Sequence, residues 1–230
     1  MRISKLISFI LHPIFMPLLA LYLSLTVLPE LEFTISHNLK LIYFIIIIST
    51  IVLPLISILI LIKIGRLSSL EMIHHKERVL PLFNMLIWML FGYLFLQNIL
   101  LYTPLLMAEF LGAIIIISLA SILSNFWKIS LHMLGVGGIL GVFIAIQILY
   151  KNTTSLIVIF VFLSGMLASA RLNEKAHNKS QIYTGFLVGL LTELIVILNY
   201  FYSKLAINSK CGYSLYIPKI NQRGQLLGCR

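Results

Sequence analysis

The stretch LIYFIIIISTIVLPLISILILIK, residues 41–63, carries no charged side chain before its final lysine. About 20 mostly apolar residues cross the hydrocarbon core of a bilayer as a helix, so this stretch is long enough to span a membrane. Similar length and composition recur in residues 7–28, 80–100, 104–124, 132–150, 154–171 and 182–204. The sequence therefore predicts an all-α fold, a polytopic membrane helical bundle with about seven transmembrane helices.

The composition agrees with a bilayer environment. Of the 230 residues, 60% are apolar and 10% are charged, whereas soluble chains carry about 25% charged residues. This excludes a soluble domain, and the long apolar runs exclude a disordered chain. Cys211 and Cys229 are the only cysteines, which excludes a disulfide scaffold. The net charge of +10 comes from residues between the apolar runs, so we expect the lipid bilayer as a partner and no nucleic acid.

The chain divides into three segments. Residues 1–40 are predicted to form an N-terminal anchor helix and a loop; the first apolar run is too long for a signal peptide, and Pro13 and Pro17 predict a kink. Residues 41–205 form one membrane helical domain. Residues 206–230 are polar, and we expect a disordered tail.

Glycines recur at helical spacing, as G-x-x-x-G from Gly137 to Gly141 and from Gly185 to Gly189. A glycine-rich phosphate loop at residues 135–138 is disfavoured, because no strand precedes it and no Lys-Ser/Thr pair follows it. Close helix packing is the better interpretation. The packing partner can belong to the same chain or to another, so the oligomeric state stays open.

Three connections are rich in polar residues: 65–79, 125–131 and 172–181. With seven spans, these connections and the N-terminus share one face of the membrane. They bring together EMIHHKERVLP (71–81), KISLH (128–132) and RLNEKAHNKSQ (171–181). Phosphoryl transfer uses such groups, because cations and hydroxyl donors stabilise the phosphate oxygens while one imidazole attacks and another acts as the acid.

The three segments resemble the motifs of the type 2 phosphatidic acid phosphatase superfamily, K-x6-R-P, P-S-G-H and S-R-x5-H-x3-D, in this order and on one face of a bundle. Arg171, His177 and Gln181 reproduce the spacing of the third motif. Ser130 and His132 match the second, with Ile129 and Leu131 in place of Pro and Gly.

The match to the first motif is looser. Arg78 is followed by Pro81 rather than by an immediate proline, and Glu71 stands at the lysine position. Lys76 can supply the missing cation from a shifted place.

The resemblance implies a six-helix phosphatase-like core over about residues 60–200. It implies an integral membrane phosphatase that hydrolyses a lipid phosphate or a prenyl (di)phosphate through a phosphohistidine. His177 is then the nucleophile, and His132 protonates the leaving alcohol and later activates water. The phosphate oxygens are held by Arg171, Arg78, Lys76 and Ser130. These cations supply the charge stabilisation, so neither a metal nor another cofactor is expected.

Gln181 departs from the family, which has Asp at this position. Its amide oxygen, four residues after His177, lies on the same helical face and can accept the imidazole N–H, but it brings no negative charge. A second hypothesis follows from the departures at Glu71, Leu131 and Gln181. It is a catalytically impaired relative that binds anionic lipid or a membrane partner.

Two other hypotheses carry less weight. A metal site formed by His74 and His75 with His132 and His177 is disfavoured, because adjacent histidines in regular structure point apart and no carboxylate or cysteine lies at ligand spacing. A transporter could use Glu109 and Glu193, which lie inside predicted spans. Glu193 lies about 18 Å beyond Gln181 along a continuous helix, too deep for the same site. A buried, hydrogen-bonded carboxyl is the plainer interpretation of both glutamates.

The expected location is the cell (inner) membrane, as an integral multi-pass protein. The motif-bearing face carries more Lys and Arg than the opposite short loops, and the positive-inside rule then places it in the cytoplasm. The basic tail lies on the opposite side, and the resemblance implies activity on the outer face in many family members. The face that holds the site stays open.

Overall fold

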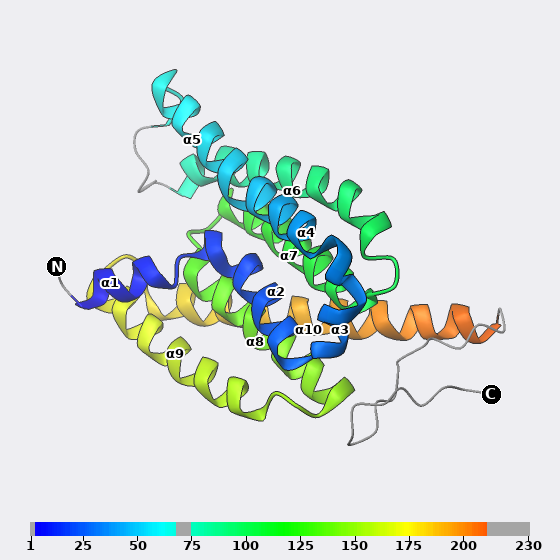
Figure 1. The fold of residues 1–230 in the computed structure, drawn as a ribbon. Coiled ribbons are helices and arrows are strands. Elements are labelled where there is room, and N and C mark those ends of the chain that lie inside the picture. The colour runs from blue at the N-terminus through cyan, green and yellow to red at the C-terminus, as the bar shows by residue number, and fades with distance from the viewer. Residues whose placement is uncertain (1–2, 68–74, 211–230) are drawn as a thin grey trace.

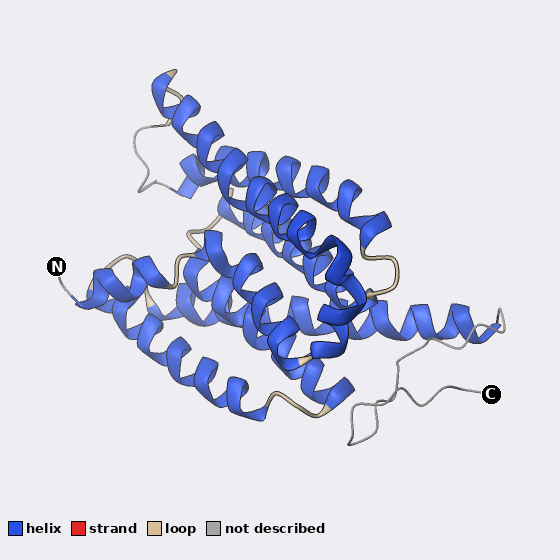
Figure 2. Ribbon diagram, in the orientation of Figure 1, coloured by secondary structure: helices blue, strands red, loops and turns tan. Residues whose placement is uncertain are grey.

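The computed structural model describes residues 3–67 and 75–210, with the side chains of residues 75, 76 and 204–210 left out of the description. These residues form helices and no strand (Figure 2). Seven helical segments are long and apolar enough to cross a membrane. The predicted all-α, polytopic membrane bundle is therefore confirmed.

The helices follow the predicted spans closely. Their bounds are α1 Ile3–Ile10, α2 Met16–Val27, α3 Pro29–Ile35, α4 Leu39–Ile47, α5 Leu53–Lys63, α6 Val79–Ile99, α7 Pro104–Ser124, α8 Leu131–Tyr150, α9 Thr154–Asn173 and α10 Lys179–Lys210. Short 3-10 turns lie at Pro13–Phe15, Ser36–Asn38 and His75–Arg78, and a π-helical turn at Ile48–Val52 joins α4 to α5.

The first span is broken between α1 and α2. His12 is extended, and its Nδ1 accepts a hydrogen bond from the backbone N–H of Ile14 at 3.3 Å. Pro13 then starts a 3-10 turn, because its ring leaves no N–H to continue α1. The kink predicted from the prolines is present.

Two boundaries differ from the prediction. Residues 29–40, expected to be a short loop, are helical, and the candidate span runs continuously from Pro29 to Lys63. Residues 29–40 carry seven polar or charged side chains among twelve residues, so this part of the helix suits a place beyond the apolar bilayer core. The last helix continues to Lys210, past the predicted boundary at residue 205. The rest of the predicted tail, residues 211–230, lies outside the described residues.

The helix ends sort onto two sides of the bundle (Figure 1). The N-terminus, the ends of α5, α7 and α9, and the starts of α6, α8 and α10 lie towards the left in this view. The helix ends that flank the three polar connections therefore lie on one side together with the start of α1, as the count of spans predicts.

Helices α8 and α10 pack closely through their glycines. A Cβ built on Gly185 would lie 2.7 Å from the carbonyl oxygen of Ser130, and one built on Gly141 would lie 2.5 Å from that of Leu190. Gly137 and Gly189 face backbone carbonyls of the other helix in the same way. The two G-x-x-x-G stretches thus pack against each other within one chain. This contact holds the start of α8 beside the start of α10.

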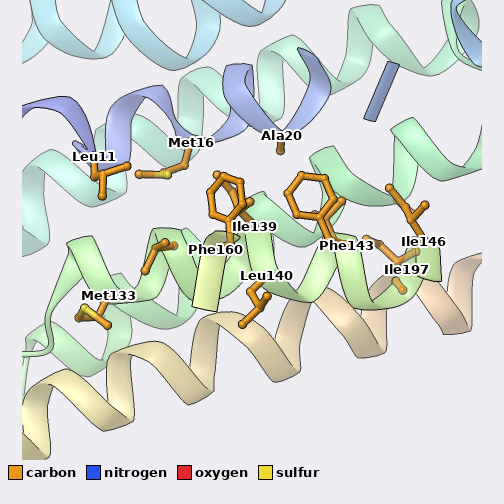
Figure 3. Close-up of a cluster of buried hydrophobic side chains, with 14 of the residues drawn as sticks. Leu11, Met16, Ala20, Met133, Ile139, Leu140, Phe143, Ile146, Phe160 and Ile197 are labelled. Atoms are coloured by element: carbon orange, nitrogen blue, oxygen red, sulfur yellow. The ribbon is translucent and has the colours of Figure 1, made fainter. Parts of the chain in front are cut away.

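The core is centred on α8. Its residues Ile139, Phe143 and Ile146 pack among side chains of α2, α9 and α10 (Figure 3). A second cluster joins α2, α4, α6 and α7 around Ile42, Met89 and Leu96. The predicted N-terminal anchor is part of both clusters through α2.

Candidate functional site

His177 and Gln181 lie at the start of α10. The Nδ1 atom of His177 lies 3.1 Å from the amide oxygen of Gln181. Asn178 caps the helix: its side-chain oxygen accepts the backbone N–H of Gln181 at 2.9 Å, and the Gln181 amide oxygen accepts the N–H of Asn178 at 3.2 Å. This reciprocal pair is a capping box, which fixes the Gln181 side chain. Because that oxygen can only accept, Nδ1 of His177 carries the proton.

The charge state of His177 follows from its surroundings. Burial lowers the pKa of His177 to about 4; the hydrogen bond to Gln181 opposes this, and the charges of Arg78, Arg171 and Lys128 add to the lowering. The imidazole is therefore neutral at pH 7. With the proton on Nδ1, the lone pair of Nε2 is available for nucleophilic attack.

Arg78 precedes α6 and is buried. Its Nη1 donates a hydrogen bond to the backbone carbonyl of Ile129 at 3.2 Å, which ties the start of α6 to the connection before α8. Burial lowers the pKa of Arg78, and the charge of Arg171 lowers it further. The pKa of Lys128 is lowered by burial and by both arginines. These cations repel one another, so a bound anion would relieve the repulsion.

Arg171 lies in the last turn of α9. Its Nη1 donates to Glu174 at 2.7 Å and to the Ser8 hydroxyl at 3.4 Å. Its Nε is buried and has no hydrogen-bond partner. After Glu174 the chain turns through Lys175, which has a positive φ of 50°, and this turn brings His177 back beside α9.

His132 lies in the first turn of α8. Its Nε2 lies 3.0 Å from the backbone carbonyl of Ser8, and its ring contacts the ring of His12 edge-on at 5.3 Å. Since the carbonyl can only accept, Nε2 donates and Nδ1 is the position left for proton exchange.

Ser130 takes the N-cap position of α8, but its hydroxyl makes no capping bond. The residue is fully buried, and its Oγ has no hydrogen-bond partner. The Ser130 hydroxyl therefore does not cap the helix, although Ser is a usual N-cap residue.

A cavity of about 1400 Å³ unites most of these residues. Arg78, His132, Arg171 and His177 line its polar end, together with Lys128. Ser130 and Gln181 do not line it. The backbone of Lys76 is in the turn before α6, but its side chain, like the whole of Glu71 and His74, lies outside the described residues.

Beyond the polar end, the cavity runs between the helices that pack around α8 and those that pack around α6 and α7. Its walls are apolar side chains such as Met85, Phe110, Ile117 and Ile139. Phe9, Phe15 and Leu55 line it and remain 67%, 41% and 41% exposed. The cavity therefore reaches the surface between the N-terminal helices and α5.

The N-terminal segment contributes residues that the sequence reasoning missed. Ser8 and His12 line the cavity with Glu174; Ser8 contacts Arg171 and Glu174, and its carbonyl contacts His132. The motif resemblance begins near residue 60, so it gave no signal for them. A polar residue within an apolar first span, as His12 is, was the available hint.

Among the residues that the structure describes, no group of three or more His, Cys, Asp or Glu side chains could hold a metal ion. The donors at the polar end are instead cations and imidazoles. Such a set suits an anion with several oxygens.

The fold and the apolar helices define a polytopic all-α membrane protein. Comparison with protein-family models, with curated proteins and with solved structures finds no match to this chain.

Proposed function

We propose that this protein is an integral membrane phosphatase that removes phosphate from a lipid phosphate or a prenyl (di)phosphate. One observation carries the proposal: a single cavity has cations and an oriented, neutral histidine at one end and apolar walls along the rest. A phosphorylated lipid has the same division between its head and its tail.

In the proposed reaction, Nε2 of His177 attacks phosphorus while Arg171 and Arg78 hold the phosphate oxygens. The N–P bond forms as the bond from phosphorus to the lipid oxygen breaks. This step requires His132 to start as an imidazolium, which gives its Nδ1 proton to that oxygen while Nε2–H stays bonded to the Ser8 carbonyl. Water then attacks the phosphohistidine, His132 takes up the water proton, and phosphate leaves with His177 neutral again. Lys76 and Ser130 are the remaining candidate phosphate ligands.

The contacts of Arg171 and His177 support these roles. The buried Nε of Arg171 lacks a hydrogen-bond partner, so a phosphate oxygen could satisfy it. The bond from His177 Nδ1 to Gln181 fixes the tautomer that a nucleophile needs. Ser130 does not line the cavity, so its contribution is expected to be the smallest.

The second candidate function is binding of an anionic lipid without hydrolysis. Gln181 orients His177 but brings no negative charge to stabilise a phosphohistidine. Glu174 also forms an ion pair with Arg171, with 2.7 Å between Oε2 and Nη1. A protein with these two features could hold a phosphate head group and leave its ester bond intact.

Phosphate release by the purified protein, in detergent and without added metal, tests the first function. The substrates are phosphatidic acid and a set of prenyl phosphates and diphosphates. The variants are His177→Ala and, as a matched control, His37→Ala, because His37 is exposed and lies in the turn before α4. Release that is lost only in His177→Ala supports the phosphatase. Equal release by both variants refutes it, and binding without release by the wild type favours the second function.

A further inference from the structure

Two acidic side chains, Glu109 of α7 and Glu193 of α10, line the inner part of the cavity. They are 6% and 3% exposed. Glu193 follows the start of α10 by 14 residues, which places it about 21 Å from the cationic end. Glu109 is five residues, or about 8 Å, from the start of α7 on the opposite side. Helix α10 is continuous over this length, so Glu193 lies far along it from the cationic end, yet the same cavity is lined by Glu193 and by the cationic residues.

The two carboxyl groups differ in their partners. An oxygen of Glu109 accepts the hydroxyl of Ser24 at 2.7 Å. The carboxyl of Glu193 makes no hydrogen bond to any residue that the structure describes. The interpretation of both as hydrogen-bonded carboxyls is therefore right for Glu109 and wrong for Glu193.

Glycines make room for the Glu193 side chain. A Cβ built on Gly112 would lie 2.6 Å from its carboxyl carbon, and one built on Gly141 would lie 3.0 Å from its Cβ. Any larger residue at Gly112 would displace the carboxyl. The absence of side chains at these two positions lets an unpartnered acid point into the cavity.

Burying such a group without a partner costs free energy, and two carboxylates that interact through an apolar cavity cost more. The cations that line the cavity, Lys5, Arg78, Lys128, Arg171 and Lys175, all belong to its other end. When one of the two carboxyls is protonated and the other is ionised, one negative charge is left in this part of the cavity, and a cation from outside the chain could compensate it.

We propose that Glu109 and Glu193 form a binding site for one monovalent cationic group. The acceptors are the two carboxyls and the Ser24 hydroxyl. These oxygens suit the three N–H donors of an ammonium group, and they can also coordinate a small alkali cation. They are too few for a divalent ion such as calcium, which takes six to eight oxygens. The source is either a free inorganic cation or the ammonium of an amphiphilic amine, whose chain the apolar walls would contact. This site is separate from the phosphate site.

The test measures the thermal unfolding midpoint of the purified protein in detergent, with no phosphate present. In one arm, sodium or potassium chloride replaces N-methylglucamine chloride at constant ionic strength. In the other, dodecylamine is compared with dodecanol, which has the same chain and no charge. The variants are Glu193→Gln and the matched control Glu32→Gln, because Glu32 is exposed and does not line the cavity.

We expect one of the two cation sources to raise the midpoint of the wild type and of Glu32→Gln. The source that does so identifies the ligand, and Glu193→Gln should need at least about tenfold more of it, as the loss of a charge-assisted hydrogen bond implies. The proposal is overturned if the wild-type midpoint is raised neither by sodium or potassium relative to N-methylglucamine, nor by dodecylamine relative to dodecanol. It is also overturned if Glu193→Gln responds like the wild type.

A second measurement keeps the proposal testable if Glu193→Gln does not fold. Dicyclohexylcarbodiimide, an apolar reagent, adds covalently to protonated carboxyls in membrane interiors, and mass spectrometry of the wild type locates the adduct. Sodium, potassium or dodecylamine should protect Glu193 from the reagent. Equal labelling with and without all of them would contradict the proposal. Neither readout depends on phosphate release, so this proposal and the phosphatase can fail separately.

Discussion

Replacing Gln181 by glutamate places a carboxylate at the atom that His177 contacts, without changing the side-chain length. The Gln181 amide oxygen accepts hydrogen bonds from His177 at 3.1 Å and from the N–H of Asn178 at 3.2 Å. A glutamate can keep both, since it is a usual residue at this position of a capping box. We expect the pKa of His177 to rise and phosphate release to become faster, because the carboxylate stabilises the positive charge that develops on the phosphorylated ring.

The size of the effect follows from Coulomb's law. Two unit charges about 4 Å apart interact by about 4 kcal/mol at an effective dielectric constant of about 20. One pKa unit corresponds to about 1.4 kcal/mol, so the upper limit is a rise of about three units. Burial and the nearby cations hold the pKa of His177 at about 4, so the variant should titrate between about 6 and 7. The same interaction in the transition state corresponds to a rate gain of about tenfold to a thousandfold.

The assay is NMR titration of the protein with isotope-labelled histidine, with the His177 signal identified by its loss in His177→Ala. Phosphate release is measured on the same samples. Gln97→Glu is the matched control, because Gln97 is exposed and lies near the end of α6 on the opposite side. A folded Gln181→Glu protein whose His177 pKa stays near 4, or which releases phosphate more slowly than wild type, would refute the electrostatic reasoning.

Three further predictions concern stability and ligand binding. The free energy of unfolding should fall as the pH is lowered from about 6.5 to about 4, because the unfolded chain then binds a proton that the buried His177 does not. His177→Ala should reduce this dependence on pH in denaturant titrations. An unchanged pH dependence would contradict the lowered pKa of His177. Gly189→Leu should destabilise the protein by about 2 kcal/mol or more in thermal or denaturant unfolding, because its side chain collides with the Leu134 carbonyl. Gly165→Leu, where no atom lies within 4 Å, should change little, and equal losses would argue against the packing role. Glu174→Gln should lower the KM for a lipid phosphate about threefold to tenfold in release assays, because Arg171 loses a competing carboxylate; a higher KM would mean that Glu174 positions Arg171 for the ligand.

Local features of the sequence predict much of the fold. Each span follows from hydropathy, and the bounds of the middle helices agree with the structure within about two residues. The glycine spacing also predicts close packing correctly. The loop predicted within residues 1–40 is instead helical over 29–40, because Pro29 stands in the first turn of α3, where a proline fits a helix.

Within the site, contacts between residues close in sequence can be predicted from spacing, and contacts between distant residues cannot. The bond between His177 and Gln181 depends on residues four apart at a helix start, and spacing alone predicts it. The bond from Arg78 to Ile129 joins residues 51 apart, and the one from His132 to Ser8 joins residues 124 apart. No periodicity encodes such pairs, because they depend on how the helices pack. The shared cavity of Glu109 and Glu193 is hidden from the sequence for the same reason.

Direct detection of phosphate on His177 tests the central proposal. The purified protein is mixed with a lipid phosphate substrate, quenched in alkali, in which the N–P bond of phosphohistidine survives, and digested for mass spectrometry. We expect phosphate on the peptide that contains His177, and none on the corresponding peptide of His177→Ala, which should also release no phosphate. Phosphate release by the wild type with His177 unmodified at every time point, together with undiminished release by His177→Ala, would contradict the proposed mechanism.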